Sequence, residues 1–213
     1  MTEPFAAGRE ADVFALDDGR VLRRYRTGAD ATGEAEVMAY AAGLGFPVPE
    51  VYSADGPDLV MERLDGPTMA QALMAGLPMN DGATMLADLL RRLHELPARS
   101  GPDSIVHLDL HPENILLTAR GPVVIDWRNA RDGPADLDTA FTALILAQVA
   151  IGSIAHPIGA RAGELLDRFL ELAPGDPLRL LDDAVAIRRR QSTLPADEVA
   201  ALGVAAARVR GVH

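Results

Sequence analysis

The chain has 213 residues, of which 48% are hydrophobic, and this is enough to bury one substantial core or two small lobes that share a cleft. Its formal charge of −11 disfavours broad electrostatic capture of nucleic acid or of an anionic membrane, so we expect neither as a partner. The chain has no cysteine, which excludes disulfides, thiolate metal sites and a cysteine nucleophile, and it has no lysine, so arginine is its only permanently charged basic side chain.

The N-terminal part of the chain shows strand patterns separated by turn signals. Alternation over residues 11–16 and an extended pattern over 21–25, with Asp-Asp-Gly between them, predict a β-hairpin. Residues 34–43 are rich in Ala, Glu and Met and end at glycine, which predicts a helix. The Phe-Pro-Val-Pro segment at 46–49 must be extended, because each proline biases the preceding residue away from helix. A strand is expected over 58–63, followed by a turn.

Beyond this strand the periodicity becomes helical. Helices are expected over 69–74 and 81–96, where apolar residues recur three and four positions apart. Short strand-like runs follow at residues 104–106, 115–117 and 123–125. The rest of the chain reads as helices broken by prolines. The order of elements therefore predicts an α+β protein. A small N-terminal antiparallel β lobe containing one helix would be joined by an extended hinge to a larger, mainly helical C-terminal lobe. The functional site is expected in the cleft between the two lobes.

One segment tests whether the chain crosses a membrane. Residues 139–160 carry no charged side chain and approach membrane-spanning length. Polar residues, a proline and glycines interrupt this stretch, so a buried core helix ending near Gly152 is the better interpretation. Residues 1–5 lack the basic and apolar pattern of a secretory signal, and we expect a cytoplasmic protein.

The segment richest in chemistry runs from His107 to Asn114, as His-Leu-Asp-Leu-His-Pro-Glu-Asn, and precedes Ile-Asp-Trp at 125–127. Phosphoryl transfer needs a group that orients the acceptor hydroxyl and takes its proton, together with oxygen ligands for Mg²⁺ on the nucleotide phosphates. Asp109, Asn114 and Asp126 can supply these groups. We therefore expect them to share one site.

Two other interpretations of this segment were weighed. A chance His-x-Asp pair would not bring matching positions on both sides in a strand, loop and strand context. A zinc site could use His107 and His111, which have helical spacing, but Pro112 and the extended flanks argue against a helix there. The kinase interpretation is favoured over both.

In order and context, these residues resemble the catalytic and metal-binding signature of the aminoglycoside phosphotransferase and choline kinase group. The resemblance implies a two-lobed protein-kinase-like fold, with an N-terminal nucleotide-binding lobe and hinge strand at 1–63 and a helical C-terminal lobe with the catalytic and metal-binding loops at 64–213. It implies that Asp109 is the catalytic base or orients the hydroxyl, and that Asn114 and Asp126 are catalytic residues that hold Mg²⁺.

The same resemblance gives structural roles to neighbouring residues. It implies that His107 braces the loop and that Asp138 stabilises the catalytic segment. His111 is expected to form a hydrogen bond within the loop. The group usually has glycine where this chain has Leu108.

In the N-terminal lobe, Gly8 lies where a phosphate-covering loop is expected, because glycine permits close approach of the backbone. Alternation lets only one of Arg23 and Arg24 face the cleft, and the resemblance selects Arg23, in place of the lysine of kinases, as the catalytic residue that binds the α- and β-phosphates. Glu34 and Glu36 both could pair with it, and the resemblance favours Glu34.

The strand that leads into the hinge is expected to hold the base of the nucleotide. By chain order within the resemblance, Met61 would lie beside the base, and backbone groups near Glu62 and Leu64 would form hydrogen bonds with a purine edge. These assignments complete the expected nucleotide site.

We therefore expect a small-molecule kinase that uses ATP or GTP with Mg²⁺ and phosphorylates a hydroxyl of a small-molecule alcohol, such as an aminoglycoside-like amino alcohol, a sugar or a nucleoside. A protein kinase is disfavoured because residues 126–138 leave little room for an activation segment. The alternative is a non-catalytic, pseudokinase-like nucleotide-binding regulator, which Arg23 and Leu108 make conceivable. The sequence predicts no oligomeric state.

Overall fold

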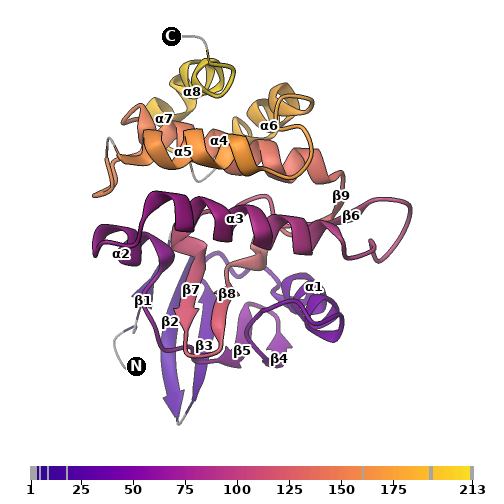
Figure 1. Ribbon diagram of the computed structural model, residues 1–213. Helices are drawn as coiled ribbons and strands as arrows, with labels where there is room; N and C mark the ends of the chain where they lie inside the picture. The colour runs from indigo at the N-terminus through magenta and orange to yellow at the C-terminus, as the bar shows by residue number, and fades with distance from the viewer. Residues whose placement is uncertain are drawn as a thin grey trace.

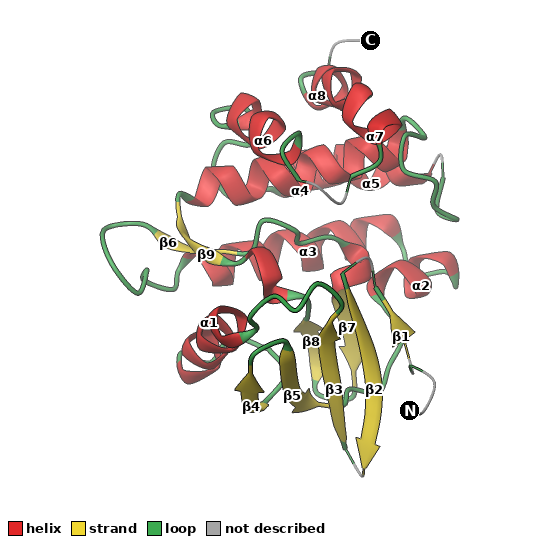
Figure 2. Ribbon diagram, turned by 180° about the vertical axis from the view of Figure 1, so that it is seen from behind, coloured by secondary structure: helices red, strands yellow, loops and turns green. Residues whose placement is uncertain are grey.

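The protein has two lobes, an antiparallel sheet with one helix and a stack of helices. The computed structural model describes residues 4, 6–8, 10–17, 19–159, 161–191 and 194–211. Figure 1 shows the sheet and α1 (Thr32–Gly43) at one end of the molecule, with α2 (Met69–Met74) and α3 (Met79–His94) between them and the helices that follow in the chain. The reverse view in Figure 2 shows the same order of layers. The fold is α+β, as the order of elements predicted.

The N-terminal lobe is a five-stranded sheet in the order β1-β2-β3-β5-β4, with every neighbouring pair antiparallel. Its strands are β1 (Ala6–Ala7), β2 (Ala11–Asp17), β3 (Arg20–Tyr25), β4 (Val51–Asp55) and β5 (Asp58–Glu62). Burial alternates along β3, so Val21, Arg23 and Tyr25 face inward while Arg24 faces solvent. The predicted hairpin is confirmed by the β2–β3 pairing. Asp18, in its turn, lies outside the described residues.

The C-terminal lobe is built around α4, whose residues from Asp136 to Gln148 are all buried. A helix that is apolar on every side must be covered on every side, and α3, α5, α6 and α8 pack around it. The helices besides α3 are α2 (Met69–Met74), α4 (Ala135–Ala150), α5 (Arg161–Leu172), α6 (Leu181–Arg188), α7 (Ala196–Ala200) and α8 (Leu202–Val209).

Two small strand pairs carry the loops between the lobes. They are β6 (Ser104–Val106) with β9 (Arg131–Gly133), and β7 (Ile115–Thr118) with β8 (Gly121–Val124). Short 3₁₀ turns, η1 (Pro112–Asn114) and η2 (Trp127–Asn129), precede β7 and follow β8. The ends of these strands place the segment from His107 to Asn114 beside Asp126.

The chain crosses between the lobes directly after β5. Arg63 N donates to the Gly19 carbonyl oxygen at 2.7 Å, which ties it to the sheet. Leu117 N donates to the Pro67 carbonyl oxygen at 2.9 Å, which ties the next segment to β7. Gly66, at φ 147°, has no room for a side chain, because an added Cβ would lie 2.2 Å from the Leu117 carbonyl oxygen.

The structure also departs from the expected elements. Strands β4 and β9 were not predicted, and α3 begins at Met79 rather than at residue 81. Helix α4 ends at Ala150, close to the expected end near Gly152. Among the described residues, no helix is both long and apolar enough to cross a membrane. The division of the chain into units at residue 63 stays a prediction.

Candidate active site

Asp138 fixes the loop that carries Asp109. Its carboxylate is fully buried and accepts hydrogen bonds from the backbone N–H groups of His107 at 2.9 Å and of Leu108 at 2.7 Å. His94 Nε2 lies 3.1 Å from the same carboxylate. Burial alone would raise the pKa of Asp138, but the hydrogen bonds from His94 and the loop backbone hold that pKa below its usual value. The ionised Asp138 carboxylate therefore fixes the backbone orientation of the loop at His107 and Leu108.

Leu108 adopts a left-handed backbone conformation with φ 59°. Residues with a side chain seldom do so, because the Cβ atom crowds the following carbonyl oxygen. Here the N–H of Leu108 is held by Asp138, and its side chain is buried at 2% exposure. Leucine therefore occupies a position whose left-handed backbone conformation glycine could adopt without strain.

Asn114 is joined to Asp109 within one loop. Asn114 Nδ2 donates to the Asp109 carbonyl oxygen at 2.9 Å and lies 3.4 Å from Asp109 Oδ2. It also lies 3.3 Å from His111 Nε2, while His111 Nδ1 accepts from the backbone N–H of Glu113. The hydrogen bonding expected of His111 within the loop is therefore present.

His107 lies behind the loop, where it links the two motif segments. Its Nε2 lies 3.1 Å from the Ile125 carbonyl oxygen, and its ring packs edge-on against Trp127 with centroids 5.0 Å apart. Burial lowers the pKa of His107, so the ring is neutral at physiological pH. A neutral, buried ring acts as a brace.

The carboxyl group of Asp109 has an environment suited to proton transfer. Burial, aided by the nearby Asp126 carboxylate, raises the pKa of Asp109 to about 6, although His107 and Arg188 act in the opposite direction. The Arg188 guanidinium lies 3.9 Å from Asp109 Oδ1. A base whose pKa lies near the working pH is effective in general base catalysis.

Asp126 follows β8 in a left-handed conformation, with φ 64°, and its carboxylate meets β3. Arg23 bridges two carboxylates, because its guanidinium lies 2.5 Å from Asp126 Oδ1 and 2.7 Å from Glu34 Oε1. Glu34 also accepts hydrogen bonds from the Tyr25 hydroxyl and from the Trp127 backbone N–H. This chain of contacts joins the sheet, α1 and the C-terminal lobe.

Arg24 and Glu36, the alternatives to Arg23 and Glu34, are exposed, as the sequence predicted. Arg24 forms an exposed ion pair with Asp58 on the adjacent strand. Glu36 is exposed on α1. As alternation required, only one of the adjacent arginines faces inward, and it is Arg23, the one that the resemblance selected.

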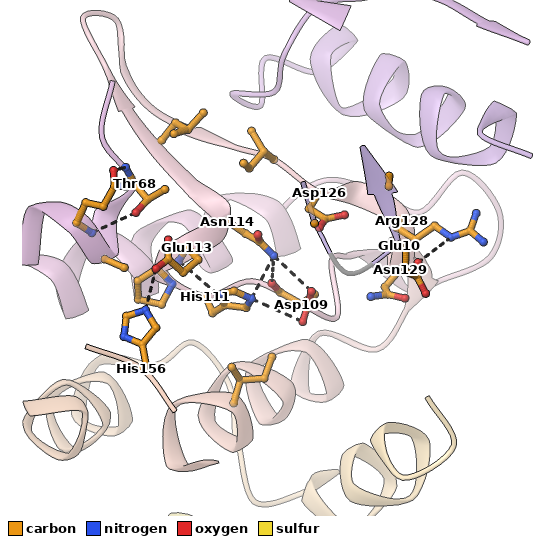
Figure 3. Close-up of a pocket in the computed structure, with 18 of the residues that line it drawn as sticks. Glu10, Thr68, Asp109, His111, Glu113, Asn114, Asp126, Arg128, Asn129 and His156 are labelled. Atoms are coloured by element: carbon orange, nitrogen blue, oxygen red, sulfur yellow. Dashed lines mark hydrogen bonds and ion pairs between the residues drawn. The ribbon is translucent and has the colours of Figure 1, made fainter. Parts of the chain in front are cut away.

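One cavity of about 920 Å³ joins the catalytic loop to the N-terminal lobe. The predicted site residues that line it are Gly8, Arg23, Met61, Glu62, Leu64, Asp109, Asn114 and Asp126. Glu34 does not line it and lies behind Arg23 instead. In Figure 3, Asp109, His111 and Asn114 point toward one another near the centre of the cavity, with Asp126 close by. Arg9, next to Gly8, lies outside the described residues.

A family model described as the phosphotransferase enzyme family matches residues 2–104 and 83–172, which together are most of the chain. The chain belongs to this family. A search of curated proteins found no match.

Solved structures of low sequence identity share the fold of this phosphotransferase. A streptomycin-ATP-APH(2″)-IIa ternary complex is 14% identical with a TM-score of 0.60, and the match covers 98% of this chain and 90% of that one. The aminoglycoside-3′-phosphotransferase of type VIII is 20% identical with a TM-score of 0.57, covering 98% and 92%. A choline/ethanolamine kinase family protein from Mesorhizobium loti is 16% identical with a TM-score of 0.59, covering 99% and 87%.

Part of the cavity of this phosphotransferase was not predicted from the sequence. Arg188 and Arg190, at the end of α6, line it, as do Glu113 and His156, which form a 2.7 Å contact. Figure 3 shows His156 and Glu113 turned toward each other. Glu113 lies within the His107–Asn114 segment, but no role was expected for it. Arg188, Arg190 and His156 belong to no local motif, and only the packing of α6 and of the segment after α4 brings them to Asp109. No sequence signal could have located them.

The side chains of Asn114 and Asp126 fit a Mg²⁺ ion held on nucleotide phosphates. Asn114 uses its Nδ2 group to hold Asp109, which turns its amide oxygen away from that contact. Asp126 uses Oδ1 toward Arg23, and its side chain is 40% exposed to the cavity and solvent. Mg²⁺ prefers oxygen ligands and usually takes only one or two from the protein, with phosphates and water supplying the others. No cluster of three or more acidic or histidine ligands occurs among the described residues, so a site held by protein alone is not indicated.

Proposed function

We propose that this protein transfers the γ-phosphoryl group of ATP or GTP to a hydroxyl group of a small molecule. The observation that carries the proposal is that Asp109, Asn114, Asp126 and Arg23 line a single cavity. Phosphoryl transfer depends mostly on positioning and on charge stabilisation, and these side chains supply a base, oxygen ligands and a cation.

In the proposed reaction, the acceptor oxygen forms a bond to the γ-phosphorus while the bond from that phosphorus to the β-phosphate oxygen breaks. Asp109 orients the hydroxyl and takes its proton, and the products are a phosphate monoester and a nucleoside diphosphate. A Mg²⁺ ion bound by Asn114 and Asp126 would neutralise phosphate charge. Asp138 positions Asp109 through the loop backbone, and His107 braces the loop from behind.

The nucleotide is proposed to bind on the side of the cavity formed by the N-terminal lobe. Gly8 would cover the phosphates, and Arg23 would contact them from a position fixed by Glu34. Met61 and the backbone near Glu62 and Leu64 would hold the base. Relatives in structure support a nucleotide co-substrate: one contains ATP with streptomycin, another AMP-PNP with Ca²⁺ and amicoumacin.

The test is nucleotide turnover against a panel of alcohols, with Asp109→Ala as the decisive variant. We expect this variant to lose turnover while nucleotide binding stays largely intact, because Asp109 acts on the acceptor. Asp126→Ala should instead remove the Mg²⁺-dependent part of the thermal stabilisation by ATP or GTP. Asp88→Ala, at an exposed carboxylate on α3, is the matched control and should change neither property. Unchanged turnover in Asp109→Ala would rule out the assigned mechanism.

The same assay has an expected pH dependence. Asp109 must be ionised to accept a proton, so turnover should fall as the pH drops through a value near 6. A flat profile from pH 5 to 8 would contradict the role of Asp109 as base. The alternative, a non-catalytic nucleotide-binding regulator, predicts Mg²⁺-nucleotide stabilisation with no turnover of any acceptor.

A further inference from the structure

The cavity continues past Asp109 into a chamber that the nucleotide assignment does not use. We call it the acceptor chamber, and its wall is formed by apolar side chains of α4, α5 and the segments that follow α4 and α6. The residues of this wall are Ile145, Leu146, Val149, Ile158, Leu165 and Leu194. Such a wall offers few hydrogen-bonding groups, so it favours the hydrocarbon part of a ligand.

Two arginines line the acceptor chamber, although the whole chain is acidic. Arg188 is buried, with its Nε donating to Gln148 Oε1 at 2.5 Å and its guanidinium 3.9 Å from Asp109. Arg190 also lines the chamber, and it is exposed. The described part of the chain gives the Arg190 guanidinium no ion pair.

The carboxylates that line this side are already engaged. Glu113 is paired with His156 at 2.7 Å, and Asp109 has the proposed role of base. A polycationic acceptor would therefore meet two arginines, and the two carboxylates of the chamber already contact His156 and Arg188. An anion, in contrast, would find Arg190 ready to pair.

We propose that the acceptor is an alcohol with a hydrocarbon body and a single anionic group, of the hydroxy acid class, whose anion pairs with Arg190. This inference rests on the proposed function and specifies its substrate. The acceptor hydroxyl would lie at Asp109, the hydrocarbon body against the apolar wall and the anionic group at the end of α6. In the transfer step the hydroxyl oxygen gains the γ-phosphoryl group and its proton passes to Asp109. Arg190 would contribute to acceptor binding and specificity.

The experiment compares acceptors of one carbon skeleton and different charge: ω-hydroxyhexanoate, hexanol and ω-aminohexanol. We expect kcat/KM to fall in this order, with phosphorylated product identified by mass spectrometry. Arg190→Gln should lower kcat/KM for ω-hydroxyhexanoate about tenfold, mainly through KM, and should lower it much less for hexanol. Arg190→Glu should reverse the order of the charged acceptors.

Arg189→Gln is the matched control, because Arg189 is an exposed neighbour that does not line the cavity. Its acceptor order should equal that of the parent. An amino alcohol that serves as well as the hydroxy acid, or equal effects of Arg189→Gln and Arg190→Gln, would overturn the inference. A further experiment replaces the hydroxy acid with a monophosphate ester of hexanediol. Comparing the two acceptors shows whether carboxylate or phosphate is the preferred anion.

The outcomes also separate this inference from the proposed function. If nucleotide turnover depended on Asp109 but showed no preference for the charge of the acceptor, the proposed acceptor class would be wrong, while the proposed phosphoryl transfer would stand. Binding of ω-hydroxyhexanoate, measured by ligand-observed NMR and weakened in Arg190→Gln, would support the chamber even if no transfer were found. Absence of both preferential binding and preferential transfer would overturn the assignment of the chamber.

Discussion

Leu108 has a left-handed backbone conformation, which destabilises the fold, and a buried side chain, which stabilises it. The backbone conformation costs about 1–2 kcal/mol for a residue with a Cβ atom. Burial of the leucine side chain stabilises the fold by about 2–3 kcal/mol. The hydrogen bond from its N–H to Asp138 further holds the conformation. Leucine at this position is therefore tolerated because its side chain packs.

Substitution at Leu108 can separate these two terms. Leu108→Ala and Leu108→Gly both lose the buried side chain, and each should lower the free energy of unfolding by about 2–4 kcal/mol. Only glycine also escapes the backbone strain, so Leu108→Gly should be more stable than Leu108→Ala by about 1 kcal/mol in urea unfolding. At Leu110, which is buried but not left-handed, the Ala variant should be the more stable one. Alanine being the more stable at both positions would contradict this account.

Residue types at fixed spacing were enough to predict the centre of the site. Asp109, Asn114 and Asp126 lie on loops whose ends are set by short strands, and the structure brings all three to one cavity. Alternation along β3 predicted that only one of Arg23 and Arg24 faces inward, and the resemblance selected Arg23, which the structure buries. Arg188 and Arg190 could not be predicted, because their place depends on how α6 packs on α4 rather than on any local pattern. Their roles, like those of the motif residues, are proposals.

Among the elements, α1 is attached to the rest of the molecule by its buried apolar side chains and by Glu34. This side chain is buried and contacts Arg23, the Tyr25 hydroxyl and the Trp127 backbone N–H. Burial raises the pKa of Glu34, while Arg23 and Tyr25 oppose the rise. The carboxylate thus joins the helix that carries it to strand β3 and to the η2 turn.

Removing this acceptor should loosen the helix measurably. Glu34→Ala would leave two hydrogen-bond donors without their acceptor and the buried Arg23 with only one of its two carboxylates, and we expect a loss of about 3 kcal/mol in the free energy of unfolding. Glu36→Ala, two positions along the same helix and exposed, should change it by less than about 0.5 kcal/mol. Urea unfolding with unchanged m-values is the measurement. Equal effects of the two substitutions would show that Glu34 does not anchor α1.

The elements that sequence patterns predicted well are those with a strong local signal. The β2–β3 hairpin has alternation and a turn, and α3 has apolar residues at helical spacing. Strand β9 was missed because its pairing with the distant strand β6, rather than its own composition, defines it. Strand β4 pairs with its neighbour β5 and was missed because its residues do not alternate between buried and exposed. The start of α3 was missed because Pro78 at its N-cap carries no side-chain capping group.

At the scale of the whole molecule, the lobes share one continuous core. The cluster of buried apolar side chains extends from Ala11 and Tyr25 in the sheet to Val209 in the last helix. Trp127, the only tryptophan, is completely buried within it, between Phe46 and His107 at centroid distances of 5.7 and 5.0 Å. The division at residue 63 therefore separates regions of the architecture that are packed as one body.

A shared core predicts a single cooperative unfolding transition. Trp127 fluorescence reports on the junction between the lobes, and far-UV circular dichroism reports mainly on the C-terminal helices. We expect the two signals to give the same urea midpoint, because loss of either lobe exposes core of the other. The observation that would refute this is exposure of the indole at a clearly lower urea concentration than loss of helix.

The crossing between lobes has one more consequence. On one side Arg63 is fastened to Gly19, and on the other Gly66 and Pro67 lie against the backbone of Leu117, so that no side chain fits between them. Among the described residues, this leaves Leu64 and Asp65 as the stretch of main chain fastened to neither body. These two residues are therefore the least constrained part of the main chain between the lobes, which are otherwise joined by contacts such as Arg23–Asp126. Because Leu64 also borders the cavity, a ligand that forms a hydrogen bond with its peptide would restrain this stretch as well.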